Sequence, residues 1–266
     1  MDITHSPFFL SLLGTGFTFL MTALGAAAVF AIGKNRQELW HSLSMGFAAG
    51  VMTAASCWSL LIPSIELAEG GTLPAYIPAA GGFIIGALFL YFLDQRIPHQ
   101  HPDSDVPEGP KTNWHRATLL FVAVTLHNIP EGMSVGLSFG MAGLTGDSGI
   151  LAASVALALG IGIQNIPEGA AVALPMLQIG KSKWQAFVIG SLSGFVELLF
   201  GVAAAVSIAL IQPAMPWLLA FTAGAMIYVV VEELIPAARL TEHTDSGTLS
   251  FIVGFTLMMV LDVALG

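Results

Sequence analysis

The sequence predicts an all-α membrane protein, a bundle of eight transmembrane helices in a single domain that spans residues 1–266. The chain is 55% hydrophobic and only 9% charged, with a mean hydropathy of +0.82, whereas a soluble domain carries about 25% charged residues. Apolar runs recur at about 20 residues, the length that crosses a hydrocarbon core of about 30 Å. They are continuously apolar and interspersed with Gly, Ala and Ser, which favours closely packed helices over the alternating strands of a barrel.

The expected spans follow one another with short connections. They lie near residues 8–33, 42–63, 75–93, 116–140, 150–178, 184–211, 216–238 and 248–265. The first is too long for a signal-peptide core and follows no basic stretch, so it is expected to be retained. The longest connection, residues 94–115, is rich in Pro and charge and is expected to be a mobile cytoplasmic loop. Its His99 and His101 can hold a metal weakly or be merely solvated.

Basic residues define the topology. With eight spans, all eight Lys and Arg residues fall on one side of the membrane. The positive-inside rule makes that side the cytoplasm and places both termini outside. The opposite face carries acids that either attract cations or are simply solvated. These acids are Asp2, Glu66, Glu69, Asp147 and Asp262. Cys57 is the only cysteine, which excludes an internal disulfide and a thiolate metal cage.

One six-residue motif occurs twice, as HNIPEG at residues 127–132 and QNIPEG at residues 164–169. The fourth span runs outward and the fifth inward, so the two copies are antiparallel, as in an inverted repeat. Three spans precede this pair and three follow it. This symmetry predicts a three-two-three arrangement in which spans one to three are inverted counterparts of spans six to eight.

Five polar residues are predicted to share one depth. His127, Glu131, Gln164, Glu168 and Glu197 each lie between 11 and 17 residues from a basic residue at the cytoplasmic boundary. At 1.5 Å per residue this is roughly 17–25 Å, near the middle of the bilayer. A charged side chain at that depth costs about 2.5–3.5 kcal/mol, and every Lys and Arg is predicted to lie elsewhere. Protonation or bound cations must therefore compensate the acids.

The spacing of the motif residues favours bound cations. His127 and Glu131 are four residues apart, so both project from one helical face, and the second copy repeats this with Gln164 and Glu168. Carboxylate, imidazole and amide oxygen suit borderline divalent metals. Pro130 and Pro167 each remove a backbone hydrogen bond and loosen the helix there. Asn128 and Asn165 turn about 100° away and could serve a second metal, with Glu131, Glu168 and Glu197 bridging. Packing alone is the alternative for any one of these residues.

On these paired motifs, in the fourth and fifth of eight spans, the chain resembles the ZIP family of zinc- and iron-regulated transporters, and most of all its compact GufA-like bacterial branch. The resemblance implies one metal position at His127, Glu131, Gln164 and Glu168. It implies a second at Asn128, Asn165, Glu168 and Glu197, with Glu131 able to bridge. Gln164 stands where many relatives have His, and its harder oxygen should admit manganese, iron or cadmium more readily.

The resemblance also implies residues along the path to the site. Met52 and Ser59 would line it, although the sequence alone favours plain packing for Met52. Glu66 would be an entrance ligand and Glu233 an exit ligand. Glu232 and Asp94 are weaker candidates, because acids near a helix end are usually only solvated.

The resemblance implies transport of divalent transition metals into the cytoplasm, zinc first and also cadmium, iron and manganese, by alternating access of the elevator type. A rigid block that holds the fourth and fifth helices would move against the rest. The metal is cargo, so neither enzymatic activity nor a catalytic cofactor is expected. Protonation of Glu131 or Glu168 would compete with the metal, because metal binding needs the charged carboxylate, and uptake should then weaken at acidic pH.

Two other classes fit part of the pattern. An intramembrane metallohydrolase would gather His and Glu at this depth, but the usual HExxH pair is absent. A proton- or sodium-coupled carrier of a small organic solute would also use broken helices, although three acids suit an anionic solute poorly. The expected partners are metal ions and the lipid bilayer, with a homodimer left open and no nucleic acid. The short loops suit a multi-pass protein of a bacterial inner membrane.

Overall fold

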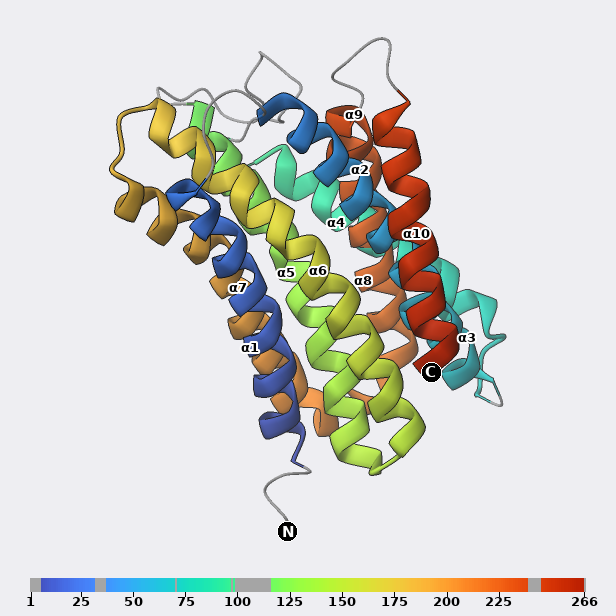
Figure 1. Cartoon of the computed structure of the whole chain (residues 1–266). Coiled ribbons are helices and arrows are strands. Elements are labelled where there is room, and N and C mark those ends of the chain that lie inside the picture. The colour runs from blue at the N-terminus through green and yellow to red at the C-terminus, as the bar shows by residue number, and fades with distance from the viewer. Residues whose placement is uncertain are drawn as a thin grey trace.

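The computed structural model describes residues 6–31, 37–69, 71–96, 98, 116–238 and 245–265, and within them it contains helices and no strand. His99 and His101 of the predicted cytoplasmic loop lie outside the described residues. The all-α bundle that the sequence predicts is confirmed. Eight long helices run alternately up and down it in the described part of the chain, with both termini at one end (Figure 1).

Three long helices precede the loop of residues 94–115, and the fourth follows it. Helix α1 (Pro7–Ala26) ends in a 3-10 turn, Ala27–Phe30. Helix α2 (Gln37–Ala55) passes through a π-helical segment, Ser56–Leu61, into α3 (Ile62–Ala68), so that this helix continues beyond the predicted span of 42–63. Helix α4 comprises Tyr76–Asp94. The fourth long helix, α5, comprises Arg116–Thr145.

The second half repeats this pattern. Helix α6 comprises Ser148–Gln178 and α7 comprises Lys183–Ile211. After a 3-10 turn, Gln212–Ala214, helix α8 (Met215–Val229) passes through a second π-helical segment, Val230–Leu234, into α9 (Ile235–Ala238). Helix α10 (Ser246–Leu265) completes the bundle.

By length and composition, seven of the long helices can cross a membrane. The remaining one, α5, has 30 residues, about 45 Å, and its apolar run is interrupted by the polar residues of HNIPEG. Large apolar side chains such as Leu20, Ile84 and Leu210 face outward, while many Ser, Thr and Asn side chains, together with Glu131 and Glu197, are buried. Apolar residues outside and polar groups paired inside are what a bilayer requires. The chain is a multi-pass integral membrane protein.

A tight connection aligns the two motif-bearing helices. Gly146 adopts a φ of 69°, and Asp147 then caps α6 by accepting hydrogen bonds from the backbone N–H groups of Gly149 (2.7 Å) and Ile150 (3.2 Å). A side-chain cap of this kind satisfies N–H groups that would otherwise lack partners. Because so few residues join α5 to α6, the two copies of the motif meet within the bundle, where Gln164 hydrogen-bonds Glu131.

Helix contacts show the inverted repeat. The helix contacts of the first half become those of the second half when each helix is replaced by its counterpart. The counterparts are α1 and α7, α2 and α8, α4 and α10, and α5 and α6. The contact of α5 with α7 matches that of α6 with α1, α2 with α10 matches α8 with α4, and α2 with α6 matches α8 with α5. The contact between α6 and α10 has no counterpart of similar extent between α5 and α4. The two halves are therefore equivalent in packing, with one departure.

Short sequence matches underlie this symmetry. Residues 47–50 of α2 read FAAG and residues 221–224 of α8 read FTAG. The glycine ending each tetrad lies against a backbone carbonyl, Gly50 against Phe251 of α10 and Gly224 against Phe83 of α4, where a Cβ would clash. Each π-helical segment also leads into a Leu-Ile-Pro sequence. Because helices can approach this closely only over a missing side chain, glycine position sets the packing of both halves.

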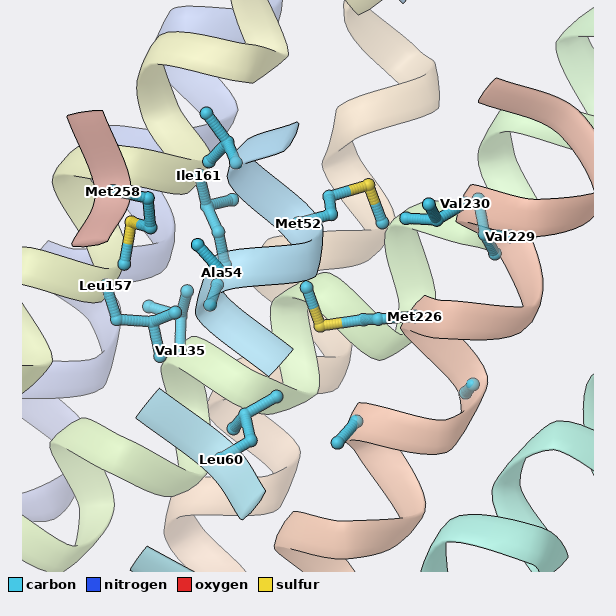
Figure 2. Packing of buried hydrophobic residues seen from close by; sticks show 14 of the residues in the cluster. Met52, Ala54, Leu60, Val135, Leu157, Ile161, Met226, Val229, Val230 and Met258 are labelled. Carbon is cyan, nitrogen blue, oxygen red and sulfur yellow. The ribbon is translucent and has the colours of Figure 1, made fainter. Parts of the chain in front are cut away.

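The helices form two blocks. The first contains α1, α5, α6 and α7, and the second contains α2, α3, α4, α8, α9 and α10. Within the first block, Phe19 of α1 and Phe195 of α7 meet edge to face, with ring centroids 6.0 Å apart. The blocks touch mainly where α2 and α10 meet α6 and where α8 meets α5. An apolar cluster that includes Met52, Val135, Leu157, Ile161 and Met226 lies there (Figure 2).

Candidate metal site

Seven polar side chains are buried near the middle of α5, α6 and α7, six of them from the two motifs and one from α7. Each is at most 6% exposed. They are His127, Asn128, Glu131, Gln164, Asn165, Glu168 and Glu197. Burial of so many polar and ionisable groups inside a membrane bundle is costly, which makes these residues candidates for a functional site.

The final glycine of each motif fixes the helix that crosses it. A Cβ on Gly132 would overlap the backbone of Glu197 in α7, and one on Gly169 would overlap the carbonyl of Thr22 in α1. Pro130 and Pro167 lie inside their helices next to these contacts. Each NIPEG sequence is thus a point at which a neighbouring helix approaches the backbone closely.

Hydrogen bonds join the two motifs to each other and to α7. Gln164 Nε2 donates to Glu131 Oε1 at 3.0 Å. Asn165 Nδ2 lies 2.9 Å from Oε1 and 2.8 Å from Oε2 of Glu197. The amide of Asn128 donates to the backbone carbonyl of Ser193, also on α7, at 2.9 Å. Carboxylates on one helix are therefore held by amides on another.

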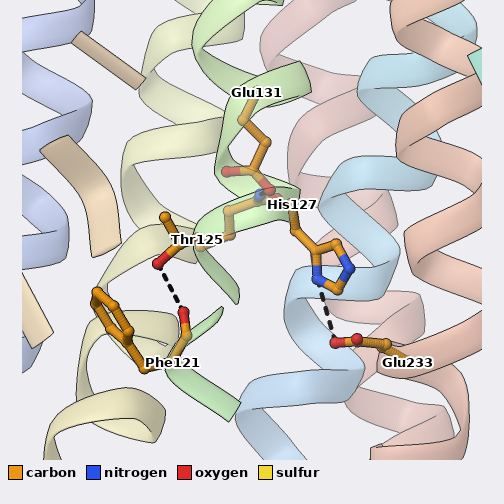
Figure 3. Close-up of polar contacts among 6 residues, drawn as sticks. Phe121, Thr125, His127, Glu131 and Glu233 are labelled. Carbon is orange, nitrogen blue, oxygen red and sulfur yellow. Dashed lines mark hydrogen bonds and ion pairs between the residues drawn. The ribbon is translucent and has the colours of Figure 1, made fainter. Parts of the chain in front are cut away.

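His127 faces the second block. Its Nδ1 lies 3.2 Å from Glu233 Oε2, in the π-helical segment after α8 (Figure 3). Glu233 is only 2% exposed, whereas the neighbouring Glu232 is exposed. Glu233, which the family resemblance implies as an exit ligand, therefore lies beside His127 of the first motif.

Like charges accumulate at this point. The carboxylates of Glu131, Glu168 and Glu197 are close enough to repel one another, and Glu168 is also repelled by Glu233. Among the described residues, Glu131, Glu168 and Glu197 form no ion pair with Lys or Arg. The described basic side chains, Arg96, Lys181 and Lys183, follow the ends of α4 and α6, away from the motifs. A cation is the group that would offset this repulsion.

Four oxygen atoms in the site accept no hydrogen bond although they are fully buried. They are Asn128 Oδ1, Glu131 Oε2, Gln164 Oε1 and Asn165 Oδ1. A buried polar atom without a partner costs about 1–3 kcal/mol, so a cluster of them calls for a ligand. Carboxylate and amide oxygens together with an imidazole form a set that divalent transition metals accept.

No three His, Cys, Asp or Glu side chains in the described part of the chain gather closely enough to form a metal cluster by themselves. Amides complete the group instead, because Gln164 hydrogen-bonds Glu131 and Asn165 hydrogen-bonds Glu197. In this arrangement their nitrogens face the carboxylates. Rotation about the last side-chain bond exchanges the amide nitrogen and oxygen, which would turn each amide from a donor into a ligand.

The other predicted path residues lie apart from this group. Met52 is fully buried in the apolar cluster, with its side chain directed toward α8 (Figure 2). Ser59, in the π-helical segment after α2, donates to Asp262 Oδ1 at 2.6 Å. Glu66 is exposed on α3. Among the described residues, no hydrogen bond or ion pair links Met52, Ser59 or Glu66 to the carboxylates of Glu131, Glu168 and Glu197.

Two acids differ from their sequence-based interpretation. Asp262 was placed among the outer-face acids that either attract cations or are solvated, and Asp94, near a helix end, was a weaker candidate because such acids are usually only solvated. They are only 8% and 4% exposed. Both occupy matching places, since residues 83–94 (FIIGALFLYFLD) and 251–262 (FIVGFTLMMVLD) align under the inverted repeat. Packing of α4 and α10 against the neighbouring helices, rather than their distance from the helix end, determines this burial.

Sequence reasoning missed the residues that hold the ligands in place. Thr22 of α1 donates to Glu197 Oε1 at 3.2 Å, and the carbonyl of Thr18 accepts from Asn165 at 3.2 Å. A hydroxyl repeated at helical spacing, as in Ser11, Thr15, Thr18 and Thr22, reads as packing. Only the crossing of α1 over Gly169 brings Thr22 to the site.

The fold and the site together define a class of protein: an all-helical, multi-pass membrane bundle built as an inverted repeat, with a buried site of carboxylate, amide and imidazole groups at its centre. The family model described as ZIP zinc transporter matches residues 98–262, more than half of the chain. The chain belongs to the ZIP family.

Curated relatives extend the match over almost the whole chain. The zinc transporter ZIP11 of Homo sapiens is 37% identical, covering 98% of this chain and 99% of its own length. The zinc transporter GufA of Myxococcus xanthus is 35% identical over 92% of this chain and 94% of its own length. The zinc transporter ZupT of Escherichia coli O81 is 31% identical over 98% and 99%. With bacterial relatives of similar length, the chain is a multi-pass protein of the bacterial plasma membrane.

A divalent transition metal should stabilise the purified protein, because it would relieve the repulsion among the buried carboxylates. At a cadmium concentration of about 100 times the dissociation constant, we expect the melting temperature in detergent to rise by roughly 5–10 °C. Glu168→Gln should melt higher than the wild type without cadmium and lose most of the shift. Glu69→Gln, which removes a charge from an exposed position, should behave like the wild type. Equal cadmium shifts in all three proteins would contradict this interpretation.

Proposed function

We propose that this protein carries divalent transition-metal ions, zinc first, through the bilayer by way of the buried site on α5 and α6, and releases them into the cytoplasm. The two NIPEG copies supply the ligands. His127, Glu131, Gln164 and Glu168 form one position, and Asn128, Asn165, Glu168 and Glu197 form a neighbour.

The observation that carries this proposal is the set of four unpaired oxygens among repelling carboxylates. Protonation would reduce the repulsion, but each proton supplies a single O–H donor, whereas one cation can bind several of the unpaired oxygens together. A cation meets both needs at once. The relatives, which are named zinc transporters, support zinc as the cargo. The oxygen of Gln164 supports a range that extends to cadmium, iron and manganese.

The direction of transport rests on charge. The described basic residues, Arg96, Lys181 and Lys183, follow α4 and α6 at the end of the bundle opposite both termini (Figure 1). By the positive-inside rule that end is cytoplasmic. The negative membrane potential inside a bacterium would then draw a divalent cation inward.

We further propose that the two blocks move relative to each other in an elevator-like cycle. The block that moves would include α1 and α7 as well as α5 and α6, because both crossing helices contact the motifs through Gly169 and Gly132. Every proposed ligand lies in that block. The second block contributes Glu233, whose carboxylate contacts His127 Nδ1 across the boundary, so this contact would break when the blocks move relative to each other.

Zinc-65 uptake into proteoliposomes tests the transport function. We expect saturable uptake by the wild type that falls at least tenfold in Glu168→Ala and His127→Ala, since loss of one ligand among few lowers metal affinity strongly. Excess cadmium should inhibit uptake and magnesium should not, because magnesium binds imidazole poorly.

The matched control is Glu69→Ala, an exposed acid on the same chain. Its uptake should equal that of the wild type. Uptake that is absent in the wild type, or unchanged in both site variants, would refute the proposed function or the proposed site. Inhibition by a small organic solute, with metals inactive, would favour the organic-solute carrier instead.

A cross-link between the blocks tests the proposed movement. Gly160 of α6 lies near Val51 of α2, since a Cβ on the glycine would be 3.5 Å from Val51 Cγ1, although it would also displace the flexible side chain of Met258 of α10. With Cys57 replaced by Ser, a disulfide between Gly160→Cys and Val51→Cys should abolish uptake until it is reduced. A disulfide between Gly140→Cys of α5 and Ala205→Cys of α7, within one block, where a Cβ on the glycine would lie 3.2 Å from that of Ala205, should leave uptake intact. Full uptake with the Gly160 and Val51 positions cross-linked would rule out relative movement of the blocks.

A further inference from the structure

Thr22 occupies, in the first half of the inverted repeat, the place that Glu197 occupies in the second. The amide of Asn128 donates to the carbonyl of Ser193, and the amide of Asn165 donates to the carbonyl of Thr18. Four residues further along each crossing helix, the motif glycine lies against the backbone, Gly132 against Glu197 and Gly169 against Thr22. The two matched positions then hydrogen-bond to each other across the repeat, at 3.2 Å.

The surroundings of Thr22 leave it little freedom. Its side chain is 1% exposed. It lies against Gly169 of α6 through its carbonyl and against Gly194 of α7 through its side chain, at both of which a Cβ would overlap it. Its hydroxyl has two acceptors within reach, the carbonyl of Thr18 at 3.3 Å and Glu197 Oε1 at 3.2 Å. A hydrogen bond to a charged oxygen is the stronger of the two.

Other hydroxyls on α1 differ in this respect. Thr15 donates to the carbonyl of Ser11 at 2.7 Å, and Thr18 donates to the carbonyl of Thr15 at 3.1 Å. Both bonds stay within the helix and are typical of threonine packed in a membrane. The hydroxyl of Thr18 also lies near the Glu197 carboxylate, but its hydrogen bond goes to the carbonyl of Thr15. Thr22 is the described hydroxyl of α1 that hydrogen-bonds to the carboxylate, at 3.2 Å.

We propose that Thr22 is a positioning residue for the second metal position, which it serves by fixing the Glu197 carboxylate. The inference rests on the proposed function. Glu197 is held from two sides, by Asn165 of α6 and by Thr22 of α1. If Asn165 rotates to present its oxygen to a metal, its bonds to Glu197 are lost, and Thr22 becomes the donor that keeps Glu197 in place. Outer partners of this kind typically change metal affinity by about 10–100-fold.

This role gives α1 a part in the site although it supplies no proposed ligand. The helix crosses α6 at Gly169 and meets α7 through Thr22 and Gly194. It therefore determines the distance between Asn165 and Glu197, the pair that would share the second ion. The first position, which contains His127, has no described contact with Thr22 and should be unaffected.

Binding of cadmium alone to purified protein, measured by equilibrium dialysis, tests the inference. The wild type is expected to bind two ions. Thr22→Val keeps the shape of the side chain but removes the hydroxyl, and it should weaken binding of one ion by about tenfold or more while the other stays unchanged. Thr22→Ser keeps the hydroxyl and should restore wild-type binding. Thr15→Val, a control on the same helix, should bind as the wild type does.

Each alternative outcome contradicts a different statement. Wild-type binding by Thr22→Val, or the same loss in Thr22→Ser as in Thr22→Val, would overturn the positioning role and leave the proposed transport function standing. Equal weakening in Thr15→Val would show a general effect of α1 packing and would also overturn it. A wild type that binds one ion would remove the second position, and one that binds none would refute the proposed function as well.

Discussion

Burial of several carboxylates without a basic partner is the constraint on which the rest of this structure depends. Glu131, Glu168 and Glu197 repel one another within the bundle, and amides from a neighbouring helix hold two of them. Such a group is unstable unless something positive shares the space. The surrounding helices bring the acids together, while the described Lys and Arg residues lie at the ends of helices away from them. Oxygens within the group have no hydrogen-bond donor and are available to a cation.

Duplication is the means by which the chain builds this group. Each NIPEG sequence supplies an asparagine that bonds the crossing helix and a glycine that allows that helix to approach. The same motif thus supplies both the candidate metal ligands and the contacts that pack the neighbouring helices around them. The halves are not identical in chemistry, because Thr22 stands opposite Glu197 and Gln164 opposite His127. This difference makes one side of the site richer in acid and leaves the other to provide hydrogen bonds.

Much of the fold and the centre of the site could be predicted from the sequence, because both depend on short-range patterns. Continuous apolar runs indicate the helices, and the repeat at 127–132 and 164–169 marks the place where two of them meet. The environment of Glu233 could not be predicted by counting residues from a helix end. It lies in a π-helical segment, Val230–Leu234, where the turn and rise differ from those of an α-helix. The contacts of Thr22 and Asp262 could not be predicted for a related reason. Their partners, Glu197 and Ser59, are distant in sequence and meet them only after the helices have packed.

The most direct test of the central statement, that the buried oxygens between α5 and α6 are a cation site, is anomalous diffraction from crystals of the protein grown with cadmium. We expect a strong anomalous peak among His127, Glu131, Gln164 and Glu168, with Gln164 Oε1 turned toward the metal. Cadmium found only at exposed acids such as Glu66, with the buried carboxylates still bonded to the amide nitrogens of Gln164 and Asn165, would contradict it.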